Sequence, residues 1–249
     1  MKLSVITVVY NNIKTIGDAI DSVLGQYYTN IEYIIVDGAS EDGTLQVVHQ
    51  YKDRISIVIS EPDKGIYDAM NKGIRAATGD VIGILNSDDI YANAKVTETI
   101  MNVFNQEPSV DIVYGDLVYV KSDNIFEVVR NWKSSSYYNR FFENGNVPPH
   151  PSLFVKRNVY KEVGLFNLNF KLAADYEIML RIFKKYKFNS KYISETIVRM
   201  RLGGATNQSC LNIVRQNLEI LRAWNQNDLK APFLLMPLRF CKRIRQYFK

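Results

Sequence analysis

Cysteine, histidine and long apolar runs are scarce in this sequence of 249 residues, and each shortage excludes a class of protein. The two cysteines, Cys210 and Cys241, stand far apart without a CxxC pair. This argues against a disulfide framework or structural zinc site and favours a reducing compartment. No apolar run approaches the roughly 18 residues of a spanning helix, and the first residues lack the pattern of a secretory signal. We therefore expect a cytoplasmic location.

The overall composition, 47% hydrophobic and 23% charged, is that of an ordinary folded domain, but the net charge of +5 is unevenly placed. From Leu229 onward there is no acidic residue, while the cations are Lys230, Arg239, Lys242, Arg243, Arg245 and Lys249. Apolar residues lie between them, a mixture that suits docking on an anionic membrane surface. The alternative is a basic helix end that packs on the main domain. We expect a peripheral protein on the inner face of the cytoplasmic membrane and no nucleic-acid partner.

Short apolar runs alternate with helical periodicity through the first half of the chain. The runs cover residues 3–10, 31–36, 55–59 and 81–85, and residues 16–24, 44–51 and 67–77 read as helices between them. A helix ending near Asn105 and strands at 111–114 and 117–120 follow. This alternation predicts an α/β fold with a mainly parallel, doubly wound sheet. Polar clusters end the strands, at 10–12, 37–42, 61–64 and 86–89, so we expect them to share one ligand-binding edge.

The second half of the chain is less regular. Residues 131–149 are aromatic and polar and are predicted to form a loop over the site. Helices are expected at 173–186 and 211–224. Residues 201–209, which contain Gly203-Gly204, are expected to be mobile.

The acidic pair Asp88-Asp89 directly follows the fourth predicted strand. Two adjacent carboxylates can bind Mg²⁺ or Mn²⁺, and such a cation offsets their repulsion. The alternative is a turn or helix N-cap, because Asn, Ser and Asp all favour those positions.

A polar run at residues 63–71 opens the third predicted helix. Asp68 and Asn71 are three residues apart and share one helical face, and Lys64 precedes the helix, where a phosphate is favoured. An ordinary first-turn acid is the alternative for Asp68.

Two further residues have chemistry to offer. His150 stands among three prolines, at 148, 149 and 151, so a rigidly held imidazole can contact an acceptor or a diphosphate; a plain loop histidine is the alternative. Asp175 follows two alanines at a helix start, where a carboxylate can act as a general base, or simply as an N-terminal helix acid.

Together these segments resemble the family 2 glycosyltransferases with the GT-A fold, over residues 3–206. The resemblance is carried by SVITVVYN at 4–11, IVDGASEDGT at 35–44, DAMNKG at 68–73, residues 77–89 and residues 173–181. The match is closest to transferases of bacterial capsule, exopolysaccharide or lipopolysaccharide assembly. It implies domain limits of 1–206, with a nucleotide-sugar half at 1–120 and an acceptor half at 121–206, followed by a C-terminal helix and tail at 207–249.

The resemblance also implies roles for single residues. The resemblance implies a UDP-linked donor, whose nucleotide would be held by Tyr10, Asn11, Asp37, Lys64, Asp68, Asn71 and Asp88. Asp89 would hold the Mn²⁺ or Mg²⁺ ion, and Asp175 would deprotonate the hydroxyl of a glycan or lipid-linked saccharide acceptor, with inversion. His150, Glu177 and Gly204 would contact the acceptor or the diphosphate. Two positions depart from the family pattern: Gly38 replaces a second acid, and Asn86 stands where Asp is frequent.

Other functions leave different patterns. A dinucleotide oxidoreductase needs a GxGxxG turn after its first strand, and a sugar nucleotidyltransferase needs a glycine-rich basic loop there; this chain has neither. A non-catalytic nucleotide- or carbohydrate-binding protein stays open, as does pairing of two chains through the last helix and tail.

Overall fold

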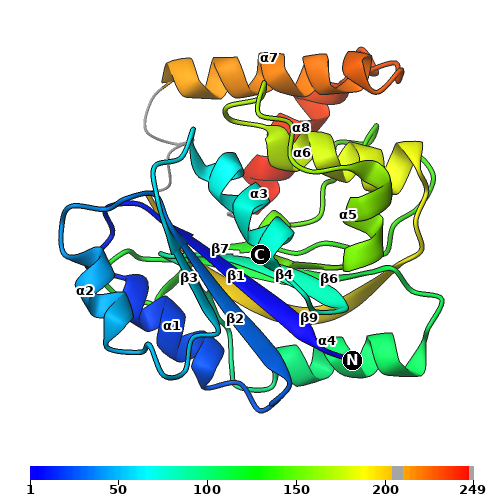
Figure 1. The fold of residues 1–249 in the computed structure, drawn as a ribbon. Helices are drawn as coiled ribbons and strands as arrows, with labels where there is room; N and C mark the ends of the chain where they lie inside the picture. Colours follow the sequence, from blue (N-terminus) through cyan, green and yellow to red (C-terminus); the bar gives the residue numbers. More distant parts are fainter. Residues whose placement is uncertain (204–209, 247–249) are drawn as a thin grey trace.

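A computed structural model of the chain describes residues 1–203 and 210–246. One curved sheet of nine strands runs through the molecule, with helices on both of its faces (Figure 1). The strands are β1 (Leu3–Val9), β2 (Ile31–Asp37), β3 (Ile57–Ser60), β4 (Val81–Asn86), β5 (Ile90–Tyr91), β6 (Ile112–Val120), β7 (Val128–Trp132), β8 (Leu153–Lys156) and β9 (Ser190–Arg201). Their order is β3-β2-β1-β4-β8-β6-β9-β5, and β7 pairs with β6.

The N-terminal half of the sheet is parallel, as the sequence predicts. β1 pairs with β2 and with β4, and β2 pairs with β3. All seven residues of β1 are buried because helices cover both faces, which explains the continuous apolar run. Parallel neighbours require crossover connections, and these contain the helices α1 (Ile16–Leu24), α2 (Thr44–His49) and α3 (Ile66–Ala76).

The other half of the sheet is mixed. β8 lies between β4 and β6 and is antiparallel to both, while β9 is parallel to β6. The runs at 111–114 and 117–120 form one strand, β6, rather than two. For β8 and β9 the sequence analysis made no prediction.

The helices are α1 (Ile16–Leu24), α2 (Thr44–His49), α3 (Ile66–Ala76), α4 (Val96–Gln106), α5 (Arg157–Val163), α6 (Ala174–Met179), α7 (Cys210–Gln226) and α8 (Leu235–Arg245), with a 3₁₀ turn η1 (His150–Ser152). The predicted helix at 173–186 is α6 continued by a π-helical segment, η2 (Leu180–Lys185). No helix in the described residues is long and apolar enough to cross a membrane.

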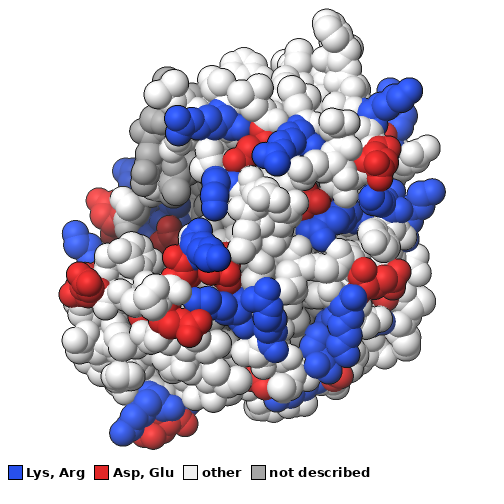
Figure 2. All heavy atoms as spheres, turned by 45° about the horizontal axis from the view of Figure 1, so that its top comes forward, with Lys and Arg blue, Asp and Glu red and all other residues white. Residues whose placement is uncertain are grey.

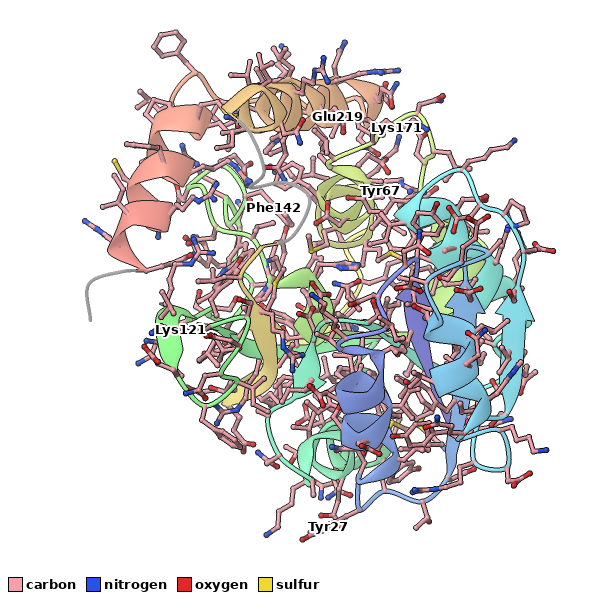
Figure 3. All side chains as sticks on the ribbon, turned by 90° about the vertical axis from the view of Figure 1, so that its left-hand side faces the viewer. Tyr27, Tyr67, Lys121, Phe142, Lys171 and Glu219 are labelled. Carbon is pink, nitrogen blue, oxygen red and sulfur yellow. The ribbon has the colours of Figure 1, made fainter. Side chains whose placement is uncertain are left out.

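The C-terminal helices pack on the domain. Ile220, Ala223 and Trp224 of α7 are buried in the core cluster that also contains residues of α3 and α6. The Glu219 carboxylate accepts hydrogen bonds from three backbone amides at 171–173, just before α6. Figure 3 shows Glu219 on α7 with Lys171 beside it. α7 therefore braces the start of α6, which carries Asp175.

Candidate functional site

A cavity of about 1870 Å³ opens at the carboxyl ends of β1 and β4. Its walls come from the strand ends at 10–12 and 86–88, the start of α6, the loop at 131–135 and 145–151, and α8. The predicted loop at 131–149 thus does border the site. Of the four polar clusters that end the strands, those at 10–12, 61–64 and 86–88 contribute lining residues; residues 37–42 do not.

The acidic turn after β4 lies at this edge, but its two carboxylates differ in environment. Asp88 lines the cavity, whereas Asp89 is fully buried behind it. The amide nitrogen of Asn86 donates to Oδ2 of Asp89 at 3.2 Å. Burial, reinforced for Asp89 by the charge of Asp88, raises the pKa of both carboxyls, and that of Asp89 strongly.

These residues fit a divalent cation. Oδ1 of Asp89 and Oδ1 of Asn86 are both buried without a hydrogen-bond partner among the described residues, and both are hard oxygen donors. Ionisation of these two neighbouring carboxyls is disfavoured, and the positive charge of a bound cation would stabilise their ionised forms. The described residues contain no group of three or more acidic, histidine or cysteine side chains that could hold a metal, so oxygen atoms of water or of a bound ligand would have to complete the coordination.

Arg201, at the end of β9, holds the acidic turn from the other side. Its Nη1 donates to the carbonyl of Asp88 at 2.7 Å, and its Nη2 bonds Asp18 of α1. The sequence analysis assigned no role to Arg201, since its partners are 113 and 183 positions away.

The predicted nucleobase pocket is built around β1 and β2. Tyr10 lines the cavity and is 65% exposed, and Asn11 joins it there. Asp37 is completely buried: its carboxylate accepts from Ser60 Oγ at 2.7 Å and from the Ser40 amide at 3.1 Å. It therefore shapes the turn after β2, and its predicted contact with the donor stays a prediction.

Asp63 supplies an acid beside Gly38, the position at which the family resemblance implies a second acid. A Cβ at Gly38 would lie 2.5 Å from Oδ2 of Asp63 and 3.2 Å from the Tyr10 ring. Asp63 lines the cavity and accepts from the Gly65 amide at 2.7 Å. The sequence analysis missed Asp63 as a site residue, because only the fold places it against residue 38.

The three residues predicted around α3 are placed differently from one another. Lys64 is exposed, and its backbone amide donates to the Asp68 carboxylate at 3.1 Å. Asn71 is buried, and its amide makes two 2.9 Å hydrogen bonds with the backbone of Phe166. None of the three lines the cavity. Asn71 joins α3 to the segment before α6, and donor contacts by these residues stay predictions.

Asp175 lies in the cavity wall at the start of α6. Tyr67 of α3 donates a 3.1 Å hydrogen bond to its Oδ1, and Figure 3 shows Tyr67 between α3 and α6. Burial, and then the charge of Asp175, raise the pKa of Tyr67 well above its usual value, so the phenol stays protonated and donates. The Tyr67 ring stacks on Phe166 at 5.6 Å. Nothing in the local sequence pointed to Tyr67.

His150 lines the same cavity. Its ring meets Phe166 edge-on at 5.7 Å, and burial lowers its pKa below the ordinary value, while Asp175 acts in the opposite direction. The imidazole is therefore neutral at pH 7. His150 and Asp175 line the same cavity, and the predicted contact of His150 with an acceptor or a diphosphate stays a prediction.

Glu177 lies away from the cavity. It is buried, with Arg181 Nη2 at 2.8 Å and Asn227 Nδ2 at 3.0 Å on its two carboxylate oxygens. It connects α6 with the end of α7, and its predicted contact with the acceptor or the diphosphate stays a prediction. Gly204 lies outside the described residues.

The domain bears strong likeness to known proteins. Residues 4–164 match the family model Glycosyl transferase family 2. A PGL/p-HBAD biosynthesis glycosyltransferase of Mycobacterium bovis is 27% identical over 209 residues, covering 82% of this chain and 78% of that protein. An uncharacterized glycosyltransferase of Mycobacterium tuberculosis is 30% identical over 181 residues, covering 72% of this chain and 68% of its own length.

Solved structures share the fold. Staphylococcus aureus TarS, residues 1–349 in complex with UDP, matches with a TM-score of 0.71 and 19% identity, over 99% of this chain and 72% of that one. The mannosyltransferase PcManGT of Pyrobaculum calidifontis, in complex with GDP-Man and Mn²⁺, matches with a TM-score of 0.67 and 18% identity. The match covers 99% of this chain and 70% of that one. These likenesses confirm the GT-A architecture, and since the family match covers more than half of the sequence, the chain belongs to the family 2 glycosyltransferases.

Proposed function

We propose that the chain is an inverting glycosyltransferase of cell-surface polysaccharide synthesis, which moves a sugar from a nucleoside-diphosphate sugar to a hydroxyl of a glycan or lipid-linked saccharide. The observation that carries this proposal is that one cavity contains both the acidic turn, through Asp88, and Asp175. TarS with UDP or UDP-GlcNAc, and PcManGT with GDP-Man and Mn²⁺, support a nucleotide-sugar donor, for which we favour the UDP form.

Asp175 acts as the base in this proposal. It accepts the proton of the acceptor hydroxyl while that oxygen attacks the anomeric carbon from the face opposite the nucleoside diphosphate. The bond from the anomeric carbon to the diphosphate oxygen breaks in the same displacement, so the configuration inverts and no second carboxylate nucleophile is needed. Tyr67 holds the Asp175 carboxylate in place through its hydrogen bond.

Asp89, with Asn86 and Asp88 beside it, would hold the Mn²⁺ or Mg²⁺ ion. Such a cation neutralises charge that develops on a leaving diphosphate. Arg201 supports the same turn by bonding the backbone of Asp88, which restrains the position of its carboxylate.

The test is a screen of nucleotide sugars by thermal shift with Mn²⁺ present, followed by a transfer assay with the sugar that binds. Asp175→Asn should keep donor affinity and lose transfer. Asp53→Asn, an exposed carboxylate outside the cavity, is the matched control and should keep both. Retained transfer in Asp175→Asn would remove Asp175 as the base, and failure of every nucleotide sugar to bind would refute the function.

We propose the exposed face of α7 as the membrane contact, in place of the tail. Four exposed apolar residues follow each other at spacings of three, four and three on this helix: Leu211, Val214, Leu218 and Leu221. Exposed Arg215 and Arg222 accompany them, and Figure 2 shows cations spread among uncharged surface on the face that carries α7. Apolar side chains flanked by cations suit an anionic bilayer surface.

Sedimentation with anionic vesicles tests this contact. Val214→Asp/Leu218→Asp should release the protein, while Phe126→Asp, which changes a residue 79% exposed in the β6–β7 connection, should not. Unchanged sedimentation of the double variant would refute the contact. Loss of a dimer in light scattering, with vesicle binding unaffected, would instead assign this face to pairing of two chains.

A further inference from the structure

Helix α8 turns its cations toward the cavity and part of its apolar surface outward. Residues at positions i, i+3, i+4 and i+7 of the helix line the cavity: Arg239, Lys242, Arg243 and Gln246. Phe240, which also borders the cavity, and Ile244 are 66% and 41% exposed. An amphipathic helix on a protein surface normally packs its apolar side inward. The reversed orientation means that α8 adds positive charge to the interior of the site.

Two contacts hold α8 in this orientation. The backbone amide of Asn131, in β7, donates to the carbonyl of Gln246 at 3.3 Å. At the other end, Gly145 lies so close to the helix that a Cβ there would be 2.8 Å from the Arg239 nitrogen. The cations are thus presented by a helix packed against two segments of the domain.

Arg239 is the best-defined of these cations. Its guanidinium carbon lies 4.8 Å from the centre of the Tyr176 ring, beside Asp175, and its Nη1 is buried without a hydrogen-bond partner among the described residues. Burial lowers the pKa of Arg239, Tyr176 and Asp175 raise it, and Arg243 lowers it further. An arginine nevertheless stays charged in a protein. A buried donor on a charged group is satisfied most readily by an oxyanion.

Most cations of the cavity lining lie on α8 or beside it, while Lys14 and Arg201 lie near the strand ends. Asp63 and Asp88 lie at the strand ends, where the donor is proposed to bind. Further cations line the wall with α8, from β7, the segment after it and the end of the helix: Arg130, Lys133 and Arg245. Asp175, the proposed base, stands on the α6 wall next to the Arg239–Tyr176 pair. A negative group at α8 is therefore adjacent to the hydroxyl that Asp175 would deprotonate.

We propose that Arg239, Lys242 and Arg243 of α8 bind a phosphate or diphosphate group of the acceptor, so that the acceptor is a lipid-linked saccharide whose charged group lies near the accepting hydroxyl. This inference rests on the proposed function, because it assumes that Asp175 meets the acceptor. A donor diphosphate carries the same chemistry, but its proposed place is the acidic turn. The outward apolar residues of α8 leave room for the lipid to continue along the protein surface.

Calorimetry with inorganic pyrophosphate separates the two sources. The protein is first saturated with UDP in the presence of Mn²⁺, and pyrophosphate is then titrated in, with the heat of pyrophosphate added to the same Mn²⁺ buffer subtracted. We expect binding alongside UDP. Competition between the two ligands would assign α8 to the donor diphosphate and overturn the proposal, as would absence of pyrophosphate binding. If UDP itself does not bind, the proposed function fails instead.

Variants of α8 test which of its residues bind pyrophosphate. Arg239→Gln and Arg243→Gln should each weaken pyrophosphate binding roughly tenfold to a hundredfold, the range for a hydrogen bond to a charged group. Arg239→Lys should weaken pyrophosphate binding less than Arg239→Gln does. Arg222→Gln is the matched control, since Arg222 also stacks on a ring, with its guanidinium carbon 5.4 Å from the centre of Phe170, but lies outside the cavity. If Arg239→Gln does not fold, Arg243→Gln and Lys242→Gln carry the test, and unchanged affinity in both would overturn it.

Binding of geranyl diphosphate tests whether the acceptor is lipid-linked. It carries the same anion on a short isoprenyl chain, so it should bind alongside UDP and lose affinity in the same variants. Binding of pyrophosphate without binding of geranyl diphosphate would overturn the lipid-linked acceptor.

Discussion

The phenol of Tyr67 donates a 3.1 Å hydrogen bond to Oδ1 of Asp175, although 108 positions separate the two residues. The bond joins α3, which lies between β3 and β4 in the chain, to α6, which follows α5. A carboxylate held by a protonated phenol keeps one oxygen oriented, so that the other can face an acceptor hydroxyl. The relationship makes Tyr67 a positioning residue for the proposed base.

Tyr67→Phe should lower the rate of sugar transfer about tenfold while donor affinity is unchanged, because a hydrogen bond to a charged group contributes about 1.5–3 kcal/mol and part of it is lost in orienting Asp175. Stacking on Phe166 is retained by the phenylalanine. The measurement is kcat and KM for donor and acceptor. Tyr27→Phe, at a residue 61% exposed, is the control. An undiminished kcat would show that Asp175 needs no such support.

Asp89→Asn should stabilise the cation-free protein at pH 7–8. Burial raises the folded-state pKa of Asp89, so the folded protein binds more protons than the unfolded chain above the ordinary carboxyl range. Its free energy of unfolding therefore falls as the pH rises through that window, and asparagine removes this cost. A gain of about 1 kcal/mol corresponds to roughly 2–4 °C in Tm.

Thermal unfolding at pH 5 and pH 8 checks this, in chelator and in Mn²⁺. Mn²⁺ with UDP should raise the Tm of the wild type more at pH 8 than at pH 5, since a cation competes with protons for the carboxylates. The Asp89→Asn variant should lack most of that increase, and Asp53→Asn should behave as wild type. An equal Mn²⁺ effect in Asp89→Asn would move the metal site elsewhere.

Gly38→Ala should weaken UDP binding several-fold, because the new Cβ would lie 2.5 Å from Asp63 Oδ2 and displace that carboxylate and the Tyr10 ring. Gly17→Ala is the matched control: its Cβ would meet no neighbour closer than 3.9 Å. Calorimetry gives both affinities. If the two variants bind UDP equally well, Asp63 has no part in recognising the nucleotide.

Asn71→Ala should lower the free energy of unfolding by about 2–4 kcal/mol, because it leaves the buried N–H and C=O of Phe166 without partners. Urea unfolding measures the loss, and Asn225→Ala, at an exposed position of α7, should change little. The UDP affinity of the folded variant then tells whether Asn71 also touches the donor. A near-wild-type stability would contradict the role we derive from its hydrogen bonds.

Local pattern was sufficient for the parallel half of the fold. The run at 3–10 is buried on both faces in β1, and that requirement is visible in the residues themselves. The pair Asp88-Asp89 directly follows a predicted strand, so its place at the ligand-binding edge followed from the strand alone. These features depend on neighbours along the chain, which a linear sequence displays.

Only the tertiary structure decided the contacts between distant segments. Asp63 beside Gly38, and Tyr67 on Asp175, pair side chains that no periodicity relates. The tail shows the same division: the sequence by itself determined only that cations and apolar residues alternate after Leu229, within the segment that forms α8. Which side faces the protein depended on Gly145 and Asn131, whose packing turns Arg239 into the cavity. Amphipathicity is a property of the helix, but its orientation is a property of the surface it meets.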